Sequence, residues 1–473
     1  MIMKRETTVF RTAALISYAI GYLYVRFVLF GSEESMERFW PLLFCILLIA
    51  AVELFSRAAG KLGSEPSAGS PVKANLPESA FFAACALIQS AAYAACGLHG
   101  DTFAPVQIFF WHFTLIYYIL CRTGMLSAGH SGILFLPDAF AGLFWLPWSN
   151  IFLRIVSVFR RGNYAKAAQS EKASGTSDGS GRETASGKEQ TENGALQKTA
   201  PGRHVRLRTV LTALLSAAAA LLICSYAWSE LSGVTNSFAE IGISLSDFFR
   251  ELFRGNFIQR ILWDFLPYFL ISLPVSAWLF GLTGGGLLRK EPPFSEEKIR
   301  KKTAGLHFLP GWSACLIFGS LTAVYLLFFA VSVREIGSQI LAVRLSVTDA
   351  CFYAVSGFWQ LVRVVSLNFI LLLSSCLFFR VPLWEEKRTR ILVTVQFVCS
   401  LLFGLLAFWK LFVWYLGMFG TTPRRALSGW MILMLLLWTV LALLRFYRKI
   451  PAARIAVLAA AASFSVLCLL PVG

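Results

Sequence analysis

The sequence predicts an all-α fold, a polytopic bundle of about eleven membrane-crossing helices with the N-terminus inside and the C-terminus outside. Hydrophobic residues make up 57% of the 473 residues and charged residues only 15%, a combination that soluble domains rarely show. The apolar residues gather into stretches close to the roughly 20 residues that a helix needs to cross a bilayer. No stretch alternates as a membrane barrel strand would, and a helix satisfies its own backbone hydrogen bonds in lipid.

Eleven stretches reach or approach the length of a crossing. In chain order they lie near 12–30, 39–56, 79–97, 103–121, 208–228, 262–282, 311–333, 360–379, 391–415, 428–444 and 455–471. The first stretch follows Lys4, Arg5 and Arg11, as the apolar part of a signal sequence would, but no small-x-small cleavage site comes after its long apolar run. We therefore expect it to be a retained first helix.

The basic residues lie mostly in alternate gaps between these stretches, and this pattern predicts the orientation. If every stretch crosses once, the gaps on the side of the N-terminus hold 32 of the 43 lysines and arginines, and the opposite gaps hold 8. Cytoplasmic loops carry such an excess of basic residues. Orientation and the anionic lipid of the inner leaflet account for the net charge of +17. Nucleic-acid binding gains no support, because the sequence has neither zinc-finger spacing nor a stacking motif.

Three segments between the crossings have a helical character of their own. The segment 131–159 is apolar and has basic residues on both flanks, but it is interrupted by Pro137, Asp138, Pro147, Trp148 and Asn150. It is predicted to be a re-entrant or interfacial pair of short helices. The outer gaps at 244–261 and 346–358 place apolar residues at helical spacing opposite charged ones, which predicts amphipathic helices on the outer interface.

The segment 162–206 differs from the rest of the chain, because it is rich in Ser, Gly, Thr, Lys and Glu. Such a composition cannot bury enough apolar surface to fold, so we expect a disordered cytoplasmic linker. It divides an N-terminal membrane unit, 1–161, with four crossings, from a C-terminal membrane unit, 207–473, with seven. The linker is either a simple tether or a docking tail for a cytoplasmic protein partner.

Catalytic and metal-binding templates are absent from the sequence. There is no P-loop, no G-x-G-x-x-G that opens a nucleotide fold, no H-E-x-x-H and no G-x-S-x-G. The ten cysteines form no C-x-x-C and the five histidines are scattered, so no metal site and no cofactor are predicted. The glycines of 281–286 are expected to end the 262–282 helix. Glu53 is expected to reach towards Arg57, and His112 is either a histidine bound to a neighbouring helix or part of a proton relay.

The candidate ligand site lies at the outer interface. Its members are Arg363, Lys410, Arg424 and Arg425, with Trp359 and Asn368 beside them. If the helices at 360–379 and 391–415 pack together, these groups form a cationic, aromatic-walled vestibule. Such a vestibule suits a phosphate, a carboxylate or an anionic lipid headgroup. The alternative is an ordinary aromatic belt with snorkelling cations.

Two stretches resemble the motifs of one protein family. The stretch 353–361, with Asn368 further on, resembles Y-A-R-x-G-F-F-E/Q-L…N, and 419–425 resembles Y-G-L-T-x-x-R. Together they resemble a widespread family of multi-spanning bacterial membrane proteins known only as a domain of unknown function. The chain departs from the motifs at Val355, Phe419 and Thr421. The matching positions are Tyr353, Gly357, Phe358, Gln360, Asn368, Gly420, Thr422 and Arg425. The resemblance implies a helical protein of the bacterial cell membrane, and it implies no activity.

Three hypotheses for function follow. The first is a membrane-embedded sensor or assembly partner whose outer cationic pocket takes an anionic lipid or ligand. The second is a permease for an anionic or amphiphilic solute, which would need a polar stripe along three or more helices. The third is an intramembrane enzyme acting on a lipid-linked substrate, which would need clustered acids or a nucleophile–base pair. Only isolated polar residues occur in the crossings, so the first hypothesis is favoured.

Overall fold

The computed structural model confirms the all-α fold. It describes residues 2–31, 37–60, 75–159, 265–289, 291–307, 309, 311–341, 358–379, 382–416 and 420–470. The long helices are α1 (Ile2–Leu23), α2 (Trp40–Gly60), α3 (Leu76–Cys96), α4 (Gly100–Thr123), α12 (Leu266–Leu288), α14 (Gly311–Leu341), α16 (Phe358–Phe378), α17 (Lys387–Trp409), α19 (Pro423–Tyr447) and α20 (Ala452–Leu469). The π-helical turn η1 (Tyr24–Leu29) continues α1, and η6 (Lys410–Leu416) continues α17.

Ten of the eleven predicted crossings are confirmed as helices long and apolar enough to cross a membrane. Their bounds differ by a few residues from the predicted ones; for example, the predicted 428–444 is observed as Pro423–Tyr447. The predicted crossing at 208–228 lies outside the described residues. The same holds for the linker 162–206 and for the amphipathic helices predicted at 244–261 and 346–358.

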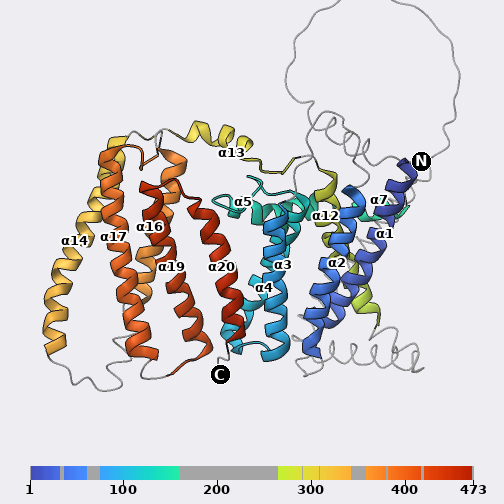
Figure 1. Ribbon diagram of the computed structural model, residues 1–473, viewed down its shortest axis with the longest axis horizontal. Coiled ribbons are helices and arrows are strands. Elements are labelled where there is room, and N and C mark those ends of the chain that lie inside the picture. The colour runs from blue at the N-terminus through green and yellow to red at the C-terminus, as the bar shows by residue number, and fades with distance from the viewer. Residues whose placement is uncertain are drawn as a thin grey trace, which may run out of the picture. The chain divides into compact units, whose positions relative to one another are not determined.

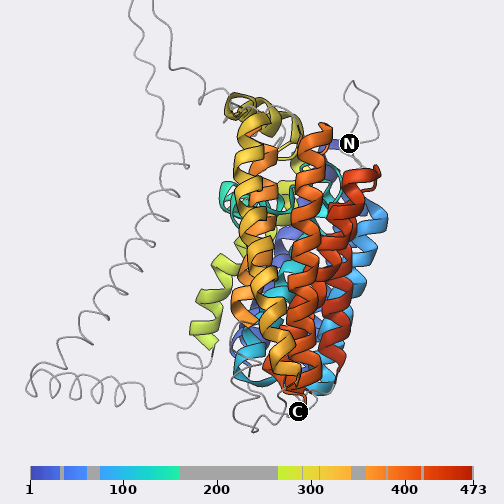
Figure 2. The ribbon, with the colours of Figure 1, turned by 90° about the vertical axis from the view of Figure 1, so that its left-hand side faces the viewer.

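The chain divides into two compact units, one of residues 1–165 with 270–473 and one of residues 166–269. Only 265–269 of the second unit are described. In the first unit α2 lies between α1 and α3, and α3 packs against α4 and α20. Helix α20 also packs on α19, which packs on α17, and α17 contacts α14 and α16 (Figures 1 and 2). The last helix of the chain therefore joins the early helices to the late ones.

The segment 131–159 is broken into short helices, as the residues that interrupt its apolar run predict. They are α5 (Phe135–Phe140), the π-helical turn η3 (Ala141–Trp145), α6 (Leu146–Ser149) and α7 (Leu153–Phe159). The stretches Phe135–Ser149 and Leu153–Phe159 are bent by 42° relative to each other. Pro147 lies near the end of the continuous helical stretch Phe135–Ser149, just before the bend.

The expectation that the glycines of 281–286 end their helix is wrong. Helix α12 continues through them to Leu288. These glycines are buried and form a packing face: a Cβ on Gly281 would lie 2.7 Å from the carbonyl oxygen of Pro147, and one on Gly286 would lie 2.9 Å from Oγ1 of Thr123. Small residues let helix backbones approach closely in membranes. Close packing, which sequence periodicity does not reveal, explains the glycines.

Large aromatic side chains fill the interior of the first unit. Phe82, Trp111 and Tyr117 belong to the core between α2, α3 and α4, and Val365 and Phe403 belong to a second core between α14, α16, α17 and α19. Large apolar side chains are also exposed along the long helices. On helices of this composition, exposed apolar side chains are suited to contact lipid, so close packing rather than exclusion of water holds the helices together.

Candidate functional site

The bundle has two ends, which we call the N end, where α1 begins, and the C end, where α20 finishes (Figure 1). Helices α4, α16 and α19 begin at the C end, and α3, α17 and α20 begin at the N end. The predicted cationic residues occur at the C end, which the basic-residue pattern places outside. The ion pairs of the partly buried Glu53 and the buried Glu78 occur at the N end.

At the C end, the first turn of α19 carries two arginines next to the first turn of α4. Pro423 opens α19 near Gly100, which has a φ of 61°; a Cβ built on Gly100 would lie 3.5 Å from Cγ of Pro423. Arg424 Nε donates a hydrogen bond of 2.6 Å to Oγ1 of Thr102. Arg425 Nη1 donates one of 2.8 Å to the carbonyl of Gly420. Arg424 thus links the first turns of α4 and α19, and Arg425 stabilises the turn that precedes α19.

The electrostatic setting of this turn favours an anion. The first N–H groups of a helix have no partner within the helix and carry a partial positive charge. Thr422 is the N-cap residue, but its side chain makes no capping hydrogen bond. Arg424 is exposed, and in the described part of the chain its guanidinium forms no ion pair with a carboxylate, although Asp101 is exposed one residue from Thr102. The two terminal nitrogens of Arg424 are therefore available to a ligand.

The other predicted site residues occupy α16, η6 and the turn before α19. Trp359, Gln360 and Arg363 lie exposed in the first two turns of α16, and Phe358 is its first residue. Lys410 is buried at the start of η6. Gly420 is exposed and has a φ of 72°, which glycine adopts without strain. Tyr353 and Gly357 lie outside the described residues. The candidate cations are thus at one end of the bundle, on three different helical segments.

Asn368 is buried in the middle of the bundle, so we assign it to the core of the unit instead of the ligand site. Its Oδ1 accepts hydrogen bonds from Tyr325 Oη at 2.8 Å and from Gln396 Nε2 at 2.7 Å. Its Nδ2 donates to Oγ of Ser400 at 2.5 Å. The amide joins α14, α16 and α17 through side chains that are all less than 5% exposed. Sequence alone could not reveal this, because it did not show which face of α16 meets α14 and α17.

Asn368→Leu is expected to destabilise the protein, because Tyr325, Gln396 and Ser400 would all lose a buried partner. One orphaned buried polar group costs about 1–3 kcal/mol, so we expect a loss of at least this size. The measurement is the midpoint of thermal unfolding in detergent micelles. Gln360→Leu makes a similar change at an exposed position of the same helix and is expected to leave the midpoint nearly unchanged. Equal midpoints for the two variants would contradict the assignment of Asn368 to a structural hub.

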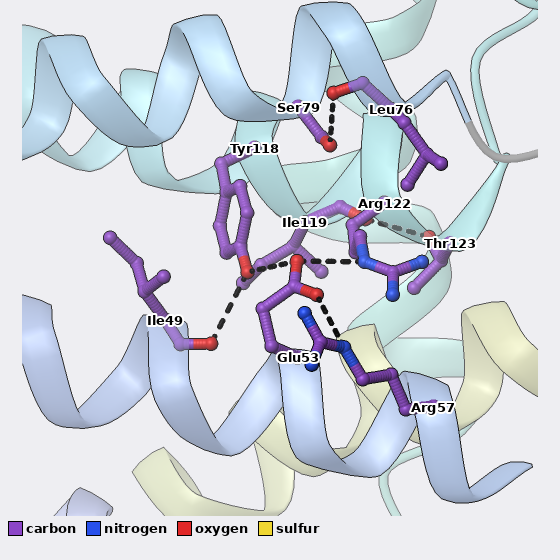
Figure 3. A network of polar contacts seen from close by, with 9 residues as sticks. All are labelled: Ile49, Glu53, Arg57, Leu76, Ser79, Tyr118, Ile119, Arg122 and Thr123. Atoms are coloured by element: carbon purple, nitrogen blue, oxygen red, sulfur yellow. Dashed lines mark hydrogen bonds and ion pairs between the residues drawn. The ribbon is translucent and has the colours of Figure 1, made fainter.

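At the N end, Glu53 of α2 is the centre of a polar network (Figure 3). Its Oε1 accepts hydrogen bonds from Arg122 Nε at 2.7 Å and from Tyr118 Oη at 3.3 Å. Arg57 Nε lies farther away, 3.7 Å from Oε2. The Arg57 side chain is 72% exposed and the Arg122 side chain 12%. The expected contact with Arg57 is present, but the more buried partner is Arg122 of α4, which sequence spacing did not indicate.

A second network at the N end joins the first turn of α3 to the start of α20. The Glu78 side chain is 3% exposed, and its Oε1 lies 2.6 Å from Nε of Arg454. Its Oε2 accepts a hydrogen bond from the backbone N–H of Ser131 at 2.8 Å. In the adjoining helix α5, the fully buried Asp138 accepts hydrogen bonds from both the backbone N–H and the hydroxyl of Ser127. Sequence reasoning missed Glu78 as a buried acid, because an acid in a first helical turn ordinarily serves as a cap.

His112 is bound to a neighbouring helical segment, one of the two roles that the sequence left open. Its Nε2 lies 2.7 Å from Tyr24 Oη of η1, and its Nδ1 lies 2.8 Å from the carbonyl of Ile108. A carbonyl only accepts, so Nδ1 carries a hydrogen. Among the described residues, no group of three or more His, Cys, Asp or Glu side chains is placed to hold a metal ion.

Comparison with known proteins identifies one family. A family described as a domain of unknown function (DUF4153) matches residues 79–473. The chain belongs to this family. No curated protein and no solved structure matches the chain. The DUF4153 region includes α4, α16 and α19, and therefore all the predicted cations of the C end, whereas Glu53 and Glu78 precede it. Each N-end network thus joins an acid before the DUF4153 region to an arginine within it.

Proposed function

We propose that this DUF4153 protein is a non-enzymatic sensor or assembly partner of the bacterial cell membrane that binds an anionic group at its C end. The ligand is a phosphate-bearing lipid headgroup or a small anion of the same chemistry. Its contacts are the terminal guanidinium nitrogens of Arg424 and the uncapped first turn of α19, with Arg425 and Arg363 as further cations. The C end is the outer side in the orientation that the basic residues predict.

The hydrogen bonding of the Arg424 guanidinium is the main support for this proposal. One nitrogen is held by Thr102, which fixes the guanidinium against α4, and its two terminal nitrogens have no partner among the described residues. A planar guanidinium with two free N–H edges matches the oxygens of a phosphate or carboxylate. A positive charge at a helix N-terminus is unfavourable in itself, and a bound anion would remove that penalty. The arrangement is therefore most stable when an anion is present.

The interior of the bundle supports binding more than transport. The buried polar groups of the described helices form separate clusters around Asn368, Glu53 and Glu78. A further small group joins Gln89, Thr114 and Ser465. No side-chain hydrogen bond between described residues joins one of these clusters to another, whereas a solute path would need polar groups along its whole length.

Arg424→Gln is expected to weaken binding of the anion about 10- to 100-fold, because a charge-assisted hydrogen bond contributes about 1.5–3 kcal/mol. The full-length protein in nanodiscs of phosphatidylglycerol and phosphatidylcholine is analysed by native mass spectrometry for retained lipid. A second arm titrates delipidated protein with inorganic phosphate and follows thermal unfolding. If phosphatidylglycerol is retained and phosphate does not shift thermal unfolding, the ligand is a lipid headgroup. If phosphate shifts thermal unfolding and no phosphatidylglycerol is retained, the ligand is a free anion.

Arg448→Gln is the matched control, because Arg448 is an exposed arginine at the opposite end of the same helix. It is expected to behave as the unmodified protein in both arms. Equal anion binding by Arg424→Gln and the unmodified protein would overturn the C-end site. If phosphate or lipid crosses the membrane of proteoliposomes and this flux depends on Arg424, the protein is a permease and the sensor function is wrong.

A further inference from the structure

A hollow of about 250 Å³ opens at the N end, on the side of the molecule that the orientation pattern places inside. It is lined by His307, Ser375, Cys376, Phe379, Pro382 and Trp384. Leu309 pairs with Phe379 as an isolated bridge, and the backbone N–H of Leu309 donates to the carbonyl of Phe378 at 3.0 Å. The stretch before α14 is thereby held against the end of α16.

The walls of the hollow are fixed by contacts on each side. Nδ1 of His307 lies 2.9 Å from the carbonyl of Phe379, which can only accept, so Nδ1 donates and Nε2 of a neutral ring is left as an acceptor. The hydroxyl of Thr389 donates to the carbonyls of Leu383 and Glu386, which holds the turn that carries Trp384. A hollow of this size is smaller than the 300–1,000 Å³ typical of drug-sized ligands, so it suits part of a larger molecule.

Two arginines lie over aromatic rings at the same end of α17 and α19. The Arg445 guanidinium lies 5.8 Å from the ring centre of Trp384, which itself lines the hollow. The Arg390 guanidinium lies 5.6 Å from the ring centre of Tyr447, whose hydroxyl lies 3.0 Å from Oγ1 of Thr394. Cation–π contacts hold both guanidiniums in place and leave their N–H edges open. Neither arginine pairs with a carboxylate of the described residues, although Glu385 and Glu386 are exposed on the adjoining turn.

The position of the hollow identifies the kind of molecule that fits it. It lies where α16 ends and α17 begins, and the exposed Trp312 and Tyr447 lie at the start of α14 and the end of α19. Exposed Trp and Tyr at helix ends are typical of the level of lipid headgroups. A molecule at this level would meet an apolar wall, a histidine acceptor and unpaired guanidiniums. Those features correspond to the upper acyl chain, the hydroxyls and the phosphate of one phospholipid.

We propose that this hollow is a specific binding site for one anionic phospholipid, with its phosphate at Arg445 and its glycerol region against His307 and Trp384. The site is distinct from the C-end site and does not depend on it. The basic residues of α13 (Glu296–Thr303) precede the hollow in the chain. Lys298 and Lys301 of that helix are already paired with Glu291 and Glu297. Arg445 is the cation that we assign to the phosphate, because its guanidinium lies over the ring of Trp384, which lines the hollow.

The test is native mass spectrometry of the full-length protein from nanodiscs that contain phosphatidylglycerol and phosphatidylcholine in equal parts. The unmodified protein is expected to retain one phosphatidylglycerol at this site that resists increasing collision energy, in addition to any lipid that Arg424→Gln removes from the C end. Arg445→Gln is expected to lower the retained fraction about tenfold, while Arg448→Gln, at an exposed arginine three residues away, leaves it unchanged. Equal losses in the two variants would indicate general attraction to basic residues and would overturn the site.

A second variant tests the hollow without changing charge. Cys376→Phe introduces a larger side chain into the lining and is expected to displace the phosphatidylglycerol while Arg445 stays in place. Retention of the lipid by a folded Cys376→Phe variant would show that the hollow is not its site. If Arg445→Gln does not fold, Cys376→Phe and Arg448→Gln still decide between a specific site and general attraction. Arg424→Gln is expected to have no effect on this lipid, which separates the outcome from that of the C-end proposal.

Discussion

Arg454→Ala is expected to be among the most destabilising single substitutions in this protein. The change leaves the carboxylate of Glu78 with its side chain 3% exposed and without the cation that now lies 2.6 Å away. Breaking a fully buried ion pair by removing one partner costs about 3–5 kcal/mol, and because the Arg454 side chain is 39% exposed we expect a loss below this range. The same pair links α20 to α3, so its loss also loosens the last helix from the early part of the bundle.

The measurement is thermal and dodecyl sulfate-induced unfolding of the protein in detergent micelles, combined with a double-mutant cycle. Glu78→Gln removes the charge but keeps an oxygen that can accept from the N–H of Ser131. The double variant Arg454→Ala/Glu78→Gln is therefore expected to be more stable than Arg454→Ala alone. Arg448→Ala, at an exposed arginine nearby, is the control and is expected to have little effect. A double variant as unstable as Arg454→Ala would contradict the explanation by an unpaired charge.

Gly281→Val is expected to force α12 away from the broken segment around α6. A Cβ at this position would lie 2.7 Å from the carbonyl oxygen of Pro147 and 3.3 Å from that of Asn150. These are backbone atoms, which cannot turn aside as a side chain can. Overpacking of a filled interior costs about 1–3 kcal/mol and occasionally more, and valine adds two methyl groups beyond the Cβ.

The effect of Gly281→Val is checked by the unfolding midpoint and by the yield of monodisperse protein on gel filtration. Gly305 offers a matched control, because a Cβ built on it meets no atom within 4 Å. Gly305→Val is expected to keep the midpoint and the yield of the unmodified protein. A Gly281→Val variant with the same midpoint and yield as Gly305→Val would show that Gly281 of α12 does not pack directly against the backbone of Pro147.

Several features of the candidate sites follow from the sequence. Arg424 and Arg425 stand out because they break the basic-residue pattern, and the structure places them on a helix start that contacts α4. The broken character of 131–159 follows from the residues that interrupt it, and the bend lies just after Ser149, at Asn150. The role of Asn368 could not be predicted from the sequence, because a polar residue in an apolar stretch is equally compatible with a ligand site and with an internal hydrogen bond. The partners Tyr325, Gln396 and Ser400 come from other helices, and only helix packing brings them together.

The N-end networks and the hollow also could not be predicted from the sequence. Glu78 and Arg454 are far apart in the chain, and their contact depends on α20 packing against α3. The hollow combines a stretch before α14 with the end of α16 and the turn before α17. Sequence analysis could not find either feature, because neither has a local motif or a fixed spacing.

The sequence by itself determined the fold class, the ten described crossings and the break in 131–159. Each of these depends on local hydrophobicity, on the length of an apolar stretch or on the residues that interrupt it. Only the tertiary structure decided which helices are neighbours, that the glycines of 281–286 form a packing face, and which buried charges are paired. The reason is that lipid is as apolar as the helix surfaces, so hydrophobicity does not select the faces that meet. Close fit and a few polar contacts between distant residues select them.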